Sequence, residues 1–128
     1  MDGGVAAEAD YRQAEAAITQ LADELSPEAA VELIGNWLQE TVGLMEEIHG
    51  LAGGEDQTKL ARLAHSLKGS SALFGLTTIQ SLCRDLESLA GKRITVGQVA
   101  LAADLQHAVD AARPMLRAQS IKLQGQQA

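Results

Sequence analysis

Apolar residues recur every three or four positions along most of this chain, which is the spacing of one face of an α-helix. No alternating run rich in Val, Ile and Thr interrupts the pattern, so no β-strand is expected. The pattern predicts five helices, over about 11–24, 27–49, 56–74, 77–91 and 95–118. Asp10 is the expected N-cap of the first helix. Ser26 is the expected N-cap of the second, with Pro27 at its first helical position, where the missing N–H is tolerated.

The last two predicted helices begin with a possible capping box. The pairs are Thr77 with Gln80 and Thr95 with Gln98. In a capping box the threonine side chain accepts a hydrogen bond from the backbone N–H of the glutamine, and the glutamine side chain accepts one from the backbone N–H of the threonine. The predicted core residues lie on one face of each helix. They are Ala14, Ile18, Leu21 and Leu25; Ile34, Leu38, Thr41, Met45 and Ile48; Leu60, Leu63, Ala64, Leu67, Ser71 and Phe74; Ile79, Leu82, Cys83, Leu86 and Leu89; and Leu101, Leu105, Ala108, Ala112 and Leu116.

Four long amphipathic helices joined by short loops predict an all-α fold, an antiparallel four-helix bundle with a short additional N-terminal helix. The 128 residues fit a single domain. We expect the bundle to occupy residues 10–118, with a flexible N-terminus at 1–9 and a flexible tail at 119–128.

The apolar segments are too short for a membrane span, which needs ~20 consecutive apolar residues. Residues 1–13 have an acidic residue at position 2 and lack the apolar core of a secretion signal, so a cytoplasmic protein without a membrane partner is expected. Cys83 is the single cysteine and lies on an apolar helix face. We expect a buried small hydrophobic residue there, with a reactive thiol as the alternative.

Charge is divided unevenly along the chain. Residues 1–57 contain thirteen Asp and Glu and one Arg, whereas residues 58–128 contain nine Lys and Arg and four Asp and Glu, for a net charge of −7. An acidic protein binds nucleic acid poorly, so no nucleic-acid partner is expected. The basic part either meets a negatively charged partner or is an ordinary solvated surface.

His65 is predicted to point away from the core. At 100° per residue it lies roughly 160° from the centre of the apolar stripe of its helix. Its neighbours on that outward face include Ala61, Arg62, Gly69 and Ala72, most of which are small. Glycine inside a helix costs roughly 1 kcal/mol relative to alanine, so Gly69 indicates that space is needed near the imidazole. We predict that these four residues form a docking surface for another protein around His65.

A longer motif includes this histidine. The segment His65-Ser66-Leu67-Lys68-Gly69-Ser70-Ser71, with Gly75, Leu82, Cys83, Leu86 and Glu87 after it, resembles the histidine-containing phosphotransfer (HPt) domain family. The pattern of that family is H-x-L-K-G-x-S/A-x-x-x-G followed by L-C-x-x-L-E. The resemblance is close over residues 60–89, and the predicted helices fit the fold of the family over about 10–118.

The resemblance implies that His65 accepts a phosphoryl group from the aspartyl phosphate of a response-regulator receiver domain and passes it to another receiver aspartate. Nε2 attacks in that family, and Lys68, three residues further along, would offset charge on the phosphoryl oxygens. Gly69 would let the receiver approach closely. The implied partners are receiver domains and a hybrid sensor histidine kinase. The chain would be a monomeric phosphoryl carrier that binds no cofactor itself, while the receiver supplies Mg²⁺.

Three other interpretations compete with this one. A di-iron bundle would use Glu46 with His49 and Asp104 with His107, but Glu46 and His107 lie more than roughly 100° from the apolar stripes. An ATP-dependent kinase would need a phosphate-binding glycine loop, which the sequence lacks. A helical adaptor that binds a receiver or kinase without transfer is the binding-module alternative.

Of the two serines after Gly69, we expect Ser71 to be a small core residue bonded to its own helix.

Overall fold

The chain folds into five helices without a strand in the part that is described. A computed structural model describes residues 2–126, and the side chains of residues 9–126. The helices are α1 (Asp2–Glu24), α2 (Pro27–Leu51), α3 (Gln57–Ala72), α4 (Thr77–Gly91) and α5 (Gln98–Gln126). The predicted all-α fold is confirmed. No helix within residues 2–126 combines the length and the apolar character needed to cross a bilayer.

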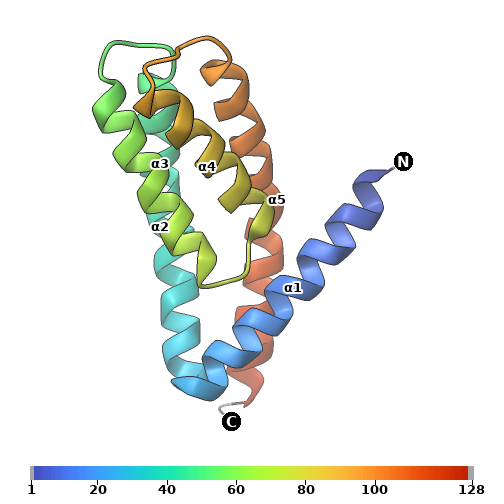
Figure 1. The fold of residues 1–128 in the computed structure, drawn as a ribbon. Helices are drawn as coiled ribbons and strands as arrows, with labels where there is room; N and C mark the ends of the chain where they lie inside the picture. The colour runs from blue at the N-terminus through green and yellow to red at the C-terminus, as the bar shows by residue number, and fades with distance from the viewer. Residues whose placement is uncertain (1, 127–128) are drawn as a thin grey trace.

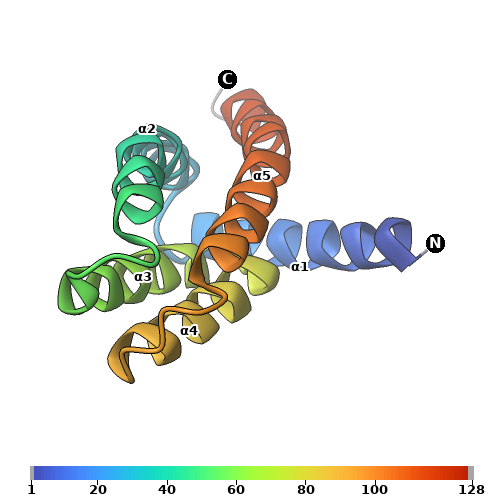
Figure 2. The same ribbon diagram turned by 90° about the horizontal axis from the view of Figure 1, so that it is seen from above.

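Helices α2 to α5 form the bundle, and α1 lies across its lower end (Figure 1). Short loops reverse the chain between successive helices, so neighbours run antiparallel. Helix α3 packs chiefly against α4, and α2 chiefly against α5. Helix α1 contacts α2 and α5, while its N-terminal end points away from the bundle (Figures 1 and 2).

The predicted apolar stripes form the core, with few exceptions. The largest fully buried side chains come from all five helices and from the connection after α3, and include Ile18, Ile34, Leu67, Leu86, Leu105 and, in that connection, Phe74. Leu38, Leu63, Leu82, Leu89, Leu101 and Ala108 are only half-buried. Leu25 was predicted in the core but is exposed, because α1 ends at Glu24 and the chain turns there. The core therefore depends mainly on aliphatic packing between helices, which the periodicity predicted.

Helix starts agree with the sequence where the cap is local. The Ser26 hydroxyl accepts a hydrogen bond from the Ala29 N–H at 3.0 Å, and Pro27 opens α2. The Asp56 carboxylate accepts a hydrogen bond from the Lys59 N–H at 3.1 Å at the start of α3. The predicted cap at Ser26 is confirmed, and so is the start of the third helix near Asp56. Helix α2 continues two residues beyond the predicted end at His49.

Both predicted capping boxes are wrong. Helix α4 starts at Thr77, its N-cap is Leu76, and no side chain caps it. The Thr77 hydroxyl instead donates to the Asp10 carboxylate of α1 at 3.3 Å. Helix α5 starts at Gln98, whose side chain is fully buried in a different set of contacts. In each case a partner distant in sequence replaces the backbone N–H that the box would have satisfied.

Gln98 and Gln57 form a buried amide pair that joins the two loops at one end of the bundle. The Gln98 amide donates to Gln57 Oε1 at 2.6 Å and to the Ile94 carbonyl at 2.8 Å. Gln98 Oε1 accepts from the Gly53 N–H at 2.8 Å and from Gln57 Nε2 at 3.2 Å. Within residues 9–126 no buried side-chain nitrogen or oxygen lacks a hydrogen-bond partner. The pair thus ties the start of α3 to the start of α5.

The two end helices are longer than predicted. Helix α1 begins at Asp2 and has 23 residues, so it is not short, and Asp10 lies inside it rather than at its N-cap. Helix α5 passes Pro114 and continues beyond 118 to Gln126, because Gln119 and Leu123 are buried. Residues 1 and 127–128 lie outside the described residues. The flexibility expected for 1–9 and 119–128 stays a prediction.

Candidate functional site

His65 lies in the middle of α3 and projects outward. Its side chain is 68% exposed, whereas Leu60, Ala64 and Leu67 on the opposite face of the helix are fully buried. The outward direction follows from the 3.6-residue period, since the apolar residues hold the other face against the core. The imidazole is therefore accessible to another macromolecule.

Glu87 of α4 holds this imidazole from across the α3–α4 interface. Its Oε2 lies 2.8 Å from His65 Nδ1. An ionised carboxylate can only accept hydrogen bonds, so this contact requires a proton on Nδ1. In the neutral ring the lone pair then lies on Nε2, on the side of the ring away from Glu87. The site presents an oriented nucleophilic nitrogen to solvent.

The same carboxylate binds Lys68. The ammonium donates from Nζ to Glu87 Oε1 at 2.6 Å, and both side chains are about one-third exposed. The hydrogen bond from Lys68 lowers the pKa of Glu87, as does the weaker one from His65, although partial burial of the carboxyl opposes them. Glu87 is therefore ionised near neutral pH, and it fixes a histidine and a lysine side by side on one exposed face. Only one of the three ammonium protons of Lys68 is used by Glu87.

The predicted docking residues surround His65 with little bulk. Gly69 and Ala72 are exposed, Arg62 is exposed, and Ala61 is half-buried against the core. A Cβ on Gly69 would meet no neighbouring side chain or helix within 4 Å. Packing inside this chain therefore does not require glycine at position 69. The placement is compatible with a docking surface, whose role stays a prediction.

Ser71 and Cys83 lie behind the site and belong to the core. The Ser71 hydroxyl accepts a hydrogen bond from Trp37 Nε1 of α2 at 3.3 Å, so its observed partner is the indole and not its own helix. Ser70 instead donates to the Leu67 carbonyl of its own helix at 3.2 Å. Cys83 is fully buried, and this burial raises the pKa of its thiol to about 12. The expectation of a buried hydrophobic cysteine is confirmed.

The residues of the di-iron alternative do not converge. Glu46, Asp104 and His107 are exposed, and His49 Nε2 lies 2.9 Å from Gln106 Oε1. No group of three His, Cys, Asp or Glu in the described part of the chain is arranged to hold a metal ion. The two carboxylate–histidine pairs are surface features of α2 and α5.

Sequence reasoning assigned no role to Glu87. A signal was present, because Glu87 ends the L-C-x-x-L-E motif and is one of only four acidic residues after residue 57. Its contact with His65 could not be predicted from one helix, since it depends on how α4 packs against α3. Lys68 was expected to turn toward a group on the ring, and the structure places its ammonium on Glu87 instead.

Comparison with known proteins adds three findings. The family model of the Hpt domain matches residues 32–119, which include His65, Lys68, Gly69 and Glu87. A similar curated protein is Multistep phosphorelay regulator 1 of Schizosaccharomyces pombe, 25% identical over 84 residues. Those residues are 66% of this chain and 28% of that protein, so the chain spans little more than a quarter of the length of this relative. No solved structure matches the chain.

Proposed function

We propose that this chain, which belongs to the Hpt domain family, performs its phosphotransfer role in a phosphorelay through His65 as the phosphoacceptor. The observation that carries the proposal is the double contact of Glu87. One carboxylate holds the proton on Nδ1 of an exposed imidazole and keeps a lysine beside it. This arrangement leaves Nε2 free to react.

The transfer step follows from that geometry. The Nε2 lone pair attacks the phosphorus of a receiver aspartyl phosphate, a new N–P bond forms, and the P–O bond to the aspartate breaks to release its carboxylate. The imidazole becomes positively charged while the proton stays on Nδ1, hydrogen-bonded to the ionised Glu87, so the carboxylate stabilises the charge that develops. Lys68, which has donors to spare, offsets the charge on the phosphoryl oxygens. Reversal of this step on a second receiver returns the histidine to its starting state.

The partners and the location complete the proposal. We expect response-regulator receiver domains and a hybrid sensor histidine kinase as partners, and a monomeric chain in the cytoplasm. The chain acts as a phosphoryl carrier without ATP-dependent kinase activity of its own. It binds no cofactor, and the receiver holds the Mg²⁺ ion that the transfer uses. Ala61, Arg62, Gly69 and Ala72 form the surface on which the receiver closes.

A labelling experiment tests this function. The full chain is incubated with a panel of receivers carrying radioactive aspartyl phosphate, and it is expected to acquire phosphate that is labile to acid and stable to base. His65→Gln should remain unlabelled with unchanged helicity, whereas His49→Gln and His107→Gln should be labelled like wild type. Persistent labelling of His65→Gln would refute the assignment. Binding of a receiver without any transfer would favour the adaptor alternative.

A further inference from the structure

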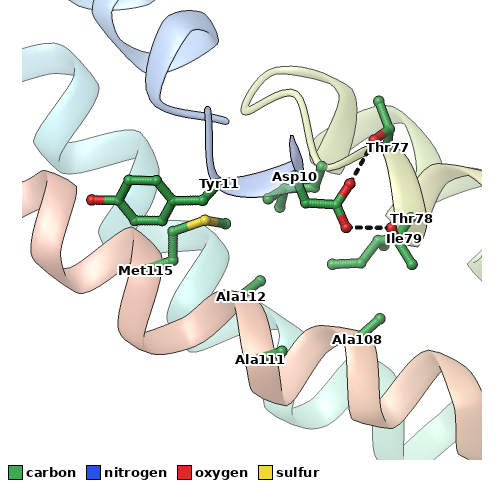
Figure 3. A pocket seen from close by; sticks show the side chains of 10 residues that line it. Asp10, Tyr11, Thr77, Thr78, Ile79, Ala108, Ala111, Ala112 and Met115 are labelled. Atoms are coloured by element: carbon green, nitrogen blue, oxygen red, sulfur yellow. Dashed lines mark hydrogen bonds between the residues drawn. The ribbon is translucent and has the colours of Figure 1, made fainter. Parts of the chain in front are cut away.

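A second feature of the surface lies away from His65, where α1 meets the bundle. A half-open pocket of about 410 Å³ is found between α1, the start of α4 and the middle of α5. Its wall is mostly apolar, with Tyr11 from α1, Leu76 and Ile79 around the start of α4, and Ala112 and Met115 from α5 (Figure 3). Pockets of this size and character are typical binding sites.

One edge of the pocket carries a negative charge. The Asp10 carboxylate accepts hydrogen bonds from the Thr77 hydroxyl at 3.3 Å and from the Thr78 hydroxyl at 2.5 Å (Figure 3). Both donors are neutral, and no Lys or Arg lines the pocket. Among the side chains described, none forms a salt bridge with Asp10. The carboxylate keeps acceptor capacity for a cationic group placed in the pocket.

The lining comes from α1, the start of α4 and α5, so an occupant packs against helices, as an amphipathic helix does when it lies in an apolar groove. The N-terminal end of α1 diverges from the bundle (Figures 1 and 2), and the pocket lies between α1, the start of α4 and α5. Among the described residues that line the pocket, Asp10 alone is charged, so the pocket is apolar with one negative edge and fits an occupant that is apolar with a positive charge. None of the lining residues belongs to the His65 site, so an occupant would leave the phosphoacceptor accessible.

We propose that this pocket docks a cationic amphipathic helix of a partner protein. A large apolar side chain of that helix fills the space over Ala112 and Met115, and a lysine or arginine one turn away pairs with Asp10. This contact is independent of the transfer at His65. It would hold a partner beside the domain while a receiver reacts with the histidine, which raises the effective concentration of linked partners.

Peptide binding to the full chain tests the proposal. The probe is a panel of designed helical peptides of about 18 residues with leucines on one face and lysines beside them. The matched control peptides carry glutamate in place of lysine. Nuclear magnetic resonance of ¹⁵N-labelled protein should show shifts of the amides at residues 76–79 and 108–115 with the lysine peptides alone. Absence of such shifts up to ~1 mM peptide would overturn the proposal, and so would equal binding of the glutamate peptides.

Variants on the exposed side of the pocket sharpen the test. Ala111 is exposed and lines the pocket, so Ala111→Trp should fill it and abolish the shifts. Asp10→Asn should weaken binding about two- to five-fold. Ala118→Trp, an exposed position of α5 outside the pocket, is the control and should bind like wild type. All three should accept phosphate normally. Undiminished peptide binding by Ala111→Trp would refute the docking site. Hexylamine is a small cationic amphiphile that cannot form a helix, and binding of hexylamine as tight as that of the lysine peptides would refute a site for a helix.

Discussion

Replacing Glu87 by alanine tests the central feature of the site, because it removes both contacts of the carboxylate at once. Loss of the acceptor frees the imidazole to rotate and to place its proton on Nε2, where it blocks attack. Loss of the charge removes stabilisation of the imidazolium that forms during transfer. The two effects act on the same step and should slow it together.

The size of the effect follows from the exposure of the site. Buried charge-assisted hydrogen bonds contribute about 1.5–3 kcal/mol, but partly exposed ion pairs contribute ~1 kcal/mol or less. Glu87 is 29% exposed, so we take about 1 kcal/mol for the hydrogen bond to His65 and a similar amount for the charge. Together these give about 2 kcal/mol. At 1.36 kcal/mol per factor of ten, Glu87→Ala should transfer ~30-fold more slowly.

Single-turnover transfer from a phosphorylated receiver, measured by rapid quench, gives the rate. Glu87→Gln keeps an acceptor oxygen for Nδ1–H but loses the charge, so it should be only about five-fold slower. Glu47→Ala is the matched control. Glu47 Oε1 forms an exposed ion pair with Lys59 Nζ at a distance of 3.5 Å and has no contact with His65, so its loss should not change the transfer rate. A purely structural role of Glu87 would leave the proton position unchanged. The ¹⁵N spectrum of labelled histidine should therefore show Nδ1–H in the wild type and a mixture in Glu87→Ala. Wild-type transfer by Glu87→Ala, or an Nε2–H signal in the wild type, would refute the reasoning.

Four further predictions concern stability, access and pH. Gly69→Ala should raise stability by about 0.5–1 kcal/mol, while Gly69→Gln should melt no lower than wild type and yet transfer phosphate much more slowly, because its side chain stands where a receiver must close; normal transfer by Gly69→Gln would rule out the docking surface. Gln98→Ala should lower the free energy of unfolding in urea by about 2–3 kcal/mol, since it leaves Gln57 Oε1 and the Gly53 N–H without their partners; a loss below ~0.5 kcal/mol would show that water replaces the amide. Cys83 should resist iodoacetamide at pH 8 in the native chain and react in urea, because burial raises the pKa of its thiol to about 12; rapid alkylation of the native chain would contradict this. Since the pKa of Glu87 is lowered in the folded chain, its stabilising effect should be complete above the ordinary value of 4.5 and disappear as the pH falls through the lower folded pKa; a stability difference from Glu87→Gln that persists below that range would be inconsistent with the ion pair.

Much of the architecture was determined by the sequence alone. The 3.6-residue period places apolar side chains on one face of each helix whatever its neighbours are. The helices, most of the core and the outward direction of His65 could therefore be predicted from the amino-acid sequence. The cap at Ser26 was equally predictable, because it joins groups three residues apart. Short-range geometry needs no knowledge of the fold.

Contacts between helices were decided only by the tertiary structure. Glu87 reaches His65 across 22 positions of sequence, and that distance depends on how α4 lies against α3. The Thr77 hydroxyl donates to the carboxylate of Asp10, 67 residues earlier, and does not form the predicted capping box. The same holds for the last turns of α5, which persist to Gln126 because Leu123 finds a buried position. A polar group satisfies its hydrogen bonds with whichever partner the packed chain brings near, and helical periodicity carries no information about the partner on another helix.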